Sequence, residues 1–193
     1  MDDLTTVKAI SDRIMQIGGA DPLVPEAAAG ASATELCRAA FNAILNGKLV
    51  AVSELAKSTG ASSQDVEQLV GRALIVDERG RVVAAHGLSA IPARQHRLTL
   101  RGRPFWTWCA IDALGIPAGL GEDAVAETTC ELCATVVRVE FNAGKVMAAS
   151  HPAARVWDAQ PPRGTRDCRT PALCAYESLL LGRAFSRVAG RPS

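Results

Sequence analysis

The stretch that decides the fold class reads VSELAKSTGASSQDVEQLVGRALIVDERGRVVA, residues 52–84. Apolar residues recur at helical spacing in 52–56 and again in 63–74, with a Thr-Gly turn between the two segments. Ser62, followed by Asp65 three residues later, has the pattern of a helix N-cap. Two β-branched runs then flank the polar turn Asp-Glu-Arg-Gly, which predicts a hairpin. Helix, turn, helix and hairpin together predict a winged-helix-like unit.

A winged helix suggests DNA binding, but the charges of this one favour a structural role. The helix expected to enter the groove, 63–74, contains Asp65, Glu67 and only one cation, Arg72. Helices that read DNA need several cations or amides to meet phosphates and base edges. We therefore expect no nucleic-acid partner.

Upstream of this unit the pattern is helical. Apolar spacing predicts a helix over 7–17, a linker over 20–32 and a second helix over 33–46. Cys37 lies on the apolar face of the second helix and is expected to be a buried thiol, since free cysteine behaves as a small hydrophobe.

Composition limits the class of protein. The 193 residues are 48% hydrophobic and 21% charged, as in ordinary globular proteins, and suffice for one large domain or two small ones. A net charge of +1 argues against bulk attraction to nucleic acid or an anionic membrane. The chain has no apolar run long enough to span a bilayer and begins with an acidic Met-Asp-Asp, so we expect a cytoplasmic protein with no membrane association.

Downstream the pattern is mixed. We expect a strand over 94–100, a turn at 101–103, and a helix that begins at Pro104 and reaches Leu114. Strands over 135–141 and 145–149 and a last helix over 172–188 complete the prediction. The fold class is therefore α+β: a helical, winged-helix-like N-terminal region (1–86), then a catalytic domain of mixed antiparallel sheet and helix (87–193).

Two residues of the helix expected from Pro104 could perform chemistry. Cys109 and Asp112 are three positions apart, so they would lie on one helical face. Trp106, Trp108 and Ile111 would form an apolar wall around them. Apolar surroundings disfavour the charged form of a carboxyl group, so Asp112 could hold a deliverable proton near neutrality.

The roles of the remaining cysteines have several possible interpretations. Cys130 and Cys133 form a Cys-x-x-Cys pair that could supply half of a zinc site, pair with each other, or simply pack. Cys168 and Cys174 could supply the other half, at a looser spacing. Without an export signal, a disulfide framework is the weaker interpretation.

Residues 103–117, RPFWTWCAIDALGIP, resemble the active-site segment of the alkylmercury (organomercurial) lyases, which have a Trp-Cys-Ala-Leu-Asp run followed by a Pro-containing turn. The winged-helix pattern leading into 98–100, the Thr-Cys at 129–130 and the segment ESLLLGRAF (177–185) are similar to that family in order and spacing. The resemblance runs from about residue 33 to residue 188, and its specificity comes mainly from 103–117.

The resemblance implies a site of two cysteines and one aspartate, both catalytic and mercury-binding. Cys109 and Asp112 match two positions, and Cys168 is the best match for the second cysteine. After Cys168 the family typically continues with a His-containing, aromatic-rich run, whereas this chain has Arg169-Thr-Pro-Ala-Leu before Cys174. Cys174 therefore competes with Cys168 for the role.

What the resemblance implies chemically is protonolysis of a carbon–mercury bond. Thiolates bind the soft metal, Asp112 supplies the proton, a hydrocarbon leaves, and Hg(II) stays on the thiolates. No organic cofactor is expected. External thiols would drive turnover by collecting Hg(II), which passes to cellular thiols or a mercuric reductase.

Two other interpretations remain at this point. The chain could be a cysteine-rich metal-binding or metal-sensing winged-helix protein, or a lyase-like relative that acts on another substrate.

Overall fold

The computed structural model describes residues 5–6, 31–93, 95–130, 134–152, 154–158 and 177–180. The helix expected over 7–17 lies outside the described residues. Three helices open the main described part of the chain: α2 (Ala31–Leu45), α3 (Val52–Thr59) and α4 (Ser63–Leu69). They confirm the helices expected there, although α4 is shorter than the predicted 63–74.

Local sequence explains how these helices begin and end. Ser62 caps α4 as expected: its hydroxyl accepts from the Asp65 amide at 3.1 Å, and the Asp65 carboxylate accepts from the Ser62 amide at 2.8 Å. α3 ends at Gly60 in the left-handed region (φ 70°), which glycine adopts without strain. Cys37 is buried in α2 with 1% exposure, as predicted.

Eight strands form one antiparallel sheet in the order β2-β3-β4-β6-β5-β7-β8-β9. They are β2 (Leu74–Val76), β3 (Val82–Ala85), β4 (Leu88–Ser89), β5 (His96–Leu100), β6 (Arg103–Thr107), β7 (Ala124–Thr129), β8 (Val136–Asn142) and β9 (Lys145–Ala149). The β2–β3 hairpin and the β8–β9 hairpin are those expected from the sequence.

The helix predicted to begin at Pro104 is wrong in its first half, because residues 103–107 form strand β6. Arg101 (φ 53°) and Gly102 (φ 70°) both have positive φ, which is the turn geometry that joins two antiparallel strands tightly. This turn pairs β6 with β5 and places Phe105 and Thr107 on the buried face. Pro104 is compatible with strand β6 because it lies near the start of that strand. At this position β5 is the neighbouring strand among the described residues.

A second, small sheet has the order β1-β10-β11, with β1 (Thr5–Thr6), β10 (Arg155–Asp158) and β11 (Glu177–Leu180). The helix predicted over 172–188 is therefore wrong at 177–180, and its other residues lie outside those described. Four residues are too few to show a period, and antiparallel pairing with β10 decides their conformation.

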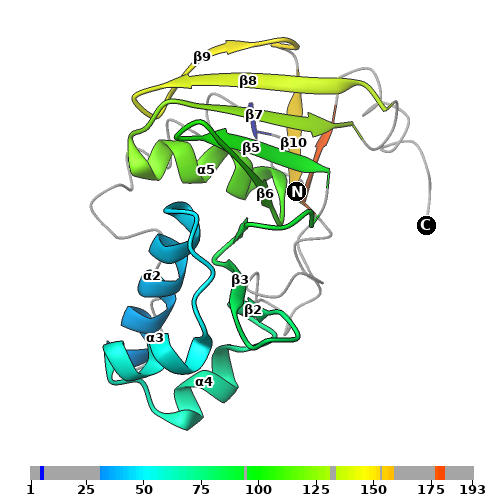
Figure 1. Cartoon of the computed structure of the whole chain (residues 1–193). Coiled ribbons are helices and arrows are strands. Elements are labelled where there is room, and N and C mark those ends of the chain that lie inside the picture. Colours follow the sequence, from blue (N-terminus) through cyan, green and yellow to red (C-terminus); the bar gives the residue numbers. More distant parts are fainter. Residues whose placement is uncertain are drawn as a thin grey trace, which may run out of the picture.

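Two helices pack against different parts of the large sheet (Figure 1). Helix α5 (Ala110–Leu120) packs on β5, β6 and β7, while α2 packs on β3 and β4. Helices α2, α3 and α4 gather at the end of the molecule that holds β2 and β3. The molecule is thus a mixed helix and antiparallel-sheet fold, and the winged-helix assignment stays a prediction.

The boundary expected between residues 86 and 87 falls within the turn that joins β3 to β4, two neighbouring strands of the large sheet. The division into two domains stays a prediction. None of the helices in the described part of the chain has the length and apolar character needed to cross a membrane.

Candidate active site

Cys109 is the N-cap of α5. The chain leaves β6 at Thr107, and Cys109 is extended (φ −147°, ψ 173°) immediately before the first helical residue. Its Sγ accepts a hydrogen bond from the Asp112 amide at 3.3 Å. The sequence placed both residues inside one helix. The structure still brings them together, but as cap and third helical residue.

This position affects the charge of the sulfur. Backbone amides at a helix N-terminus carry partial positive charge, which favours a thiolate over a thiol. Cys109 is 2% exposed, and loss of hydration opposes the charge. The amide of Asp112 offsets part of that cost by donating directly to the sulfur.

Gly87 forms the surface against which the Asp112 side chain lies. A Cβ atom added at Gly87 would come within 2.4 Å of the Asp112 Cγ and within 2.5 and 2.6 Å of its two oxygens. Gly87 has φ +80°, and its carbonyl accepts from the Trp108 amide at 3.0 Å. The β3–β4 turn therefore contacts both the aspartate and the segment that precedes the cysteine.

A buried threonine holds the Cys109 backbone. The Thr107 hydroxyl, in a fully buried side chain, donates to the Cys109 carbonyl at 3.0 Å. Across the sheet Thr107 pairs with His96, whose Nδ1 shares a hydrogen bond with the Thr128 hydroxyl. Three buried polar residues on β6, β5 and β7 thus lie on one row of the sheet, and Thr107 connects this row to the cysteine.

Apolar side chains enclose the thiol. Cys109 forms a small buried cluster with Ala84 and Trp108, against which Ile75 and Ile111 pack. Trp108 and Ile111 thus belong to the apolar wall expected from the sequence. Trp106 is half-buried on β6, between the buried Phe105 and Thr107, so strand alternation directs it to the other face.

Sequence reasoning missed Gly87, Thr107, His96 and Thr128. A signal existed for Gly87, because His-Gly between two short apolar runs is a hairpin-turn pattern. The other three are polar residues at inward positions of strands, and this becomes visible only when the strand boundaries are known.

The other candidate cysteines are placed only in part. Cys168, Cys174 and Cys133 lie outside the described residues. Cys130 is described: it follows β7, is 1% exposed, and its amide donates to the Thr135 carbonyl at 2.9 Å. Within the described ranges, no group of three or more His, Cys, Asp or Glu side chains is arranged to hold a metal ion. The second thiolate and the zinc site both stay predictions.

The sequence of this chain is similar to those of known alkylmercury lyases. The family model "MerB: Alkylmercury lyase" matches residues 88–184, a range that begins at β4 and includes Cys109 and Asp112. The alkylmercury lyase of Streptomyces lividans is 30% identical over 148 residues, covering 76% of this chain and 67% of that protein. The alkylmercury lyase of Bacillus cereus is 28% identical over 121 residues, covering 62% of this chain and 55% of that protein.

The match to the Bacillus cereus protein means that this chain spans about half the length of that relative. Among solved structures, the mercury-bound form of MerB2 has a TM-score of 0.69 at 20% identity, covering 97% of this chain and 89% of that one. At this identity the structural match supports the fold alone.

Proposed function

The chain belongs to the alkylmercury lyase family, and from this we propose that it cleaves carbon–mercury bonds by protonolysis. One observation supports this most directly: the Cys109 sulfur caps α5 and accepts from the amide of Asp112, one helical turn away from it along the chain. A soft nucleophile and a proton donor are thereby held by the same helix terminus.

Cys109 acts first in the proposed reaction. Its thiolate displaces the weaker ligand on the organomercurial cation and forms a sulfur–mercury bond, as soft metals favour sulfur. Cys168 is proposed as the second thiolate, with Cys174 as the competing candidate. A second sulfur on mercury increases the electron density on the attached carbon and makes it more basic.

Asp112 completes the reaction by supplying the proton. The electron pair of the carbon–mercury bond goes to carbon, which takes the proton and leaves as a hydrocarbon. Hg(II) stays on the two thiolates. The burial of Cys109 and its apolar neighbours limits water near the reacting atoms, and the helix terminus holds the backbone of Asp112 next to the sulfur that would bind the metal.

External thiols regenerate the enzyme by removing Hg(II), which passes to cellular thiols or to a mercuric reductase, and no organic cofactor takes part. The unit of α3, α4, β2 and β3 is proposed to be a winged helix with a structural role, since the turn that leaves β3 contains Gly87, which contacts Asp112.

The direct test is benzene release from phenylmercuric acetate by the purified, reduced protein with excess thiol. We expect release by the wild type and none by Cys109→Ser. Cys37→Ala is the matched control, because it removes a buried thiol from α2 and leaves the site intact. A folded, reduced wild-type sample that releases no benzene would contradict the proposal.

A further inference from the structure

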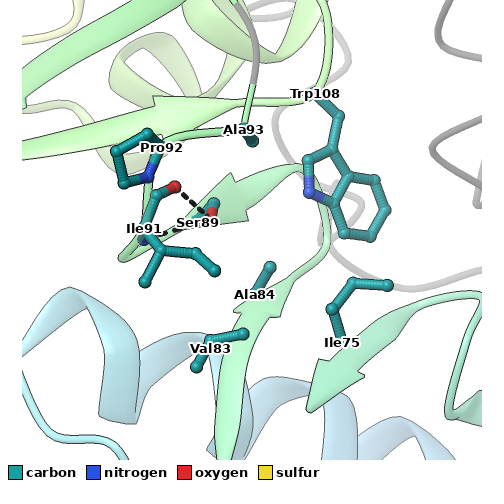
Figure 2. Close-up of a pocket in the computed structure, with 8 residues that line it drawn as sticks. All are labelled: Ile75, Val83, Ala84, Ser89, Ile91, Pro92, Ala93 and Trp108. Atoms are coloured by element: carbon teal, nitrogen blue, oxygen red, sulfur yellow. Dashed lines mark hydrogen bonds between the residues drawn. The ribbon is translucent and has the colours of Figure 1, made fainter. Parts of the chain in front are cut away.

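A pocket of about 330 Å³ opens beside the candidate site, between the β2–β3 hairpin and the loop that follows β4 (Figure 2). We propose that this pocket receives the organic group of the substrate and makes the protein prefer organomercurials with a large apolar or aromatic group. The inference rests on the proposed function and assigns a substrate class to it.

The pocket adjoins the buried cluster that contains Cys109. Ala84 and Trp108 line the pocket and are also the two buried residues that cluster with Cys109. Ile75 lines the pocket too and packs against the same cluster. Mercury attached to the Cys109 sulfur would therefore have its organic group next to this pocket.

The lining of the pocket is almost entirely apolar. Every lining side chain other than Ser89 is apolar or the indole of Trp108, and no lining residue is charged. The Ser89 hydroxyl donates to the Ile91 carbonyl at 2.7 Å and accepts from the Ile91 amide at 3.2 Å, so its proton is engaged within the loop (Figure 2). The pocket thus suits a hydrocarbon group better than a polar one.

Size and shape agree with an aromatic group. Apolar cavities of about 150 Å³ bind benzene, so a pocket of about 330 Å³ has room for a phenyl ring. Figure 2 shows the Trp108 indole at one end and Ile91 and Pro92 at the other. An indole favours an aromatic partner through stacked or edge-to-face contact.

The rim of the pocket offers a further apolar contact. Ile91 is 45% exposed and is one of three large exposed hydrophobic side chains among the described residues, together with Val136 and Met147. An exposed isoleucine at the mouth of a pocket gains burial when an apolar ligand enters.

The test compares phenylmercuric and methylmercuric acetate in the full-length protein with two rim variants. Ile91→Ala removes contact area, and Ala93→Leu fills part of the mouth; both positions are exposed, so the fold should persist. For each variant we expect kcat/KM for phenylmercury to fall about tenfold, mainly through a higher KM, because the lost contact in Ile91→Ala and the obstruction in Ala93→Leu affect the ground state and the transition state alike. For methylmercury we expect a change of less than about twofold.

Val136→Ala is the matched control, since it truncates an exposed hydrophobic side chain on β8 outside the pocket. It should leave both substrates unaffected. If both variants cleave phenylmercury and methylmercury in the wild-type ratio, the pocket assignment is overturned and the proposed function stands. If the wild-type protein cleaves neither compound, the proposed function fails and the assignment fails with it.

Discussion

Gly87 and Asp112 are in direct contact although they belong to different parts of the chain. The Cα of Gly87, in the β3–β4 turn, lies so close to the Asp112 carboxyl group that a Cβ would be 2.4 Å from its Cγ. The candidate proton donor is therefore positioned by its own helix and by the turn between β3 and β4.

Gly87→Ala is expected to reduce kcat by about a hundredfold, because the added methyl group must displace the Asp112 carboxyl and small misplacements of reacting groups have effects of this size. Because alanine is strained at the positive φ of this position, the variant should also have a free energy of unfolding lower by about 1–3 kcal/mol. Steady-state kinetics and urea unfolding measure the two effects.

Gly80→Ala separates the effect on kcat from the effect on stability. Gly80 has φ +70° and open space around its Cα, so alanine there brings the strain without the clash. We expect a comparable loss of stability with normal kcat. Equal losses of kcat in both variants would show that Gly87 does not position Asp112.

Asp112→Asn is expected to bind phenylmercury through Cys109 but to release benzene about 10²–10⁴-fold more slowly, because it keeps the shape of the side chain and removes the transferable proton. Mass spectrometry of the protein should find the phenylmercury adduct, and gas chromatography should find little benzene. Asp123→Asn is the control: Asp123 is an exposed carboxylate that accepts from the Ala143 amide, outside the site. Normal benzene release by Asp112→Asn would assign the proton to another donor.

Thr107→Val removes the hydrogen bond to the Cys109 carbonyl and leaves a buried oxygen without this donor. We expect the free energy of unfolding to fall by about 1–3 kcal/mol and kcat to fall several-fold, since the carbonyl belongs to the residue that caps α5. Thr107→Ser should restore kcat because it keeps the hydroxyl. A serine variant as slow as the valine variant would assign Thr107 a packing role instead.

Glu122 gives the fold a predictable pH dependence. The Arg101 guanidinium, whose Nε donates to the Glu122 carboxylate at 2.8 Å, holds the pKa of Glu122 below its usual range. A lowered folded-state pKa means that this stabilisation is present above the unfolded-state pKa and is lost as the pH falls through the folded value.

Glu122→Gln should therefore lower the free energy of unfolding by less than about 1 kcal/mol at pH 7, since the pair is partly exposed. The difference from wild type should vanish at a pH below the folded-state pKa. Glu67→Gln, which changes an exposed carboxylate on α4, is the matched control for removal of a surface charge. A difference for Glu122→Gln that persists in acid would show that the side chain acts by packing.

Periodicity predicted most of the helices and hairpins correctly where the signal was local. The apolar face of α2, the Ser62 cap of α4 and the β8–β9 hairpin are each specified by residues within a few positions of one another. The prediction was wrong at 103–107 and 177–180, where short apolar runs fit a helix or a strand equally well and pairing with β5 and β10 selects the strand.

The sequence by itself determined the residue types of the site: a cysteine and an aspartate three positions apart, within a segment that resembles the alkylmercury lyases. Only the tertiary structure decided that Cys109 is the N-cap of α5, that Gly87 contacts Asp112, and that Thr107 binds the Cys109 carbonyl. The reason is physical. Helix periodicity depends on neighbours in the chain, whereas the strand pairing that ends β6 just before Cys109 and the packing of Gly87 on Asp112 depend on residues that the fold brings from a distance.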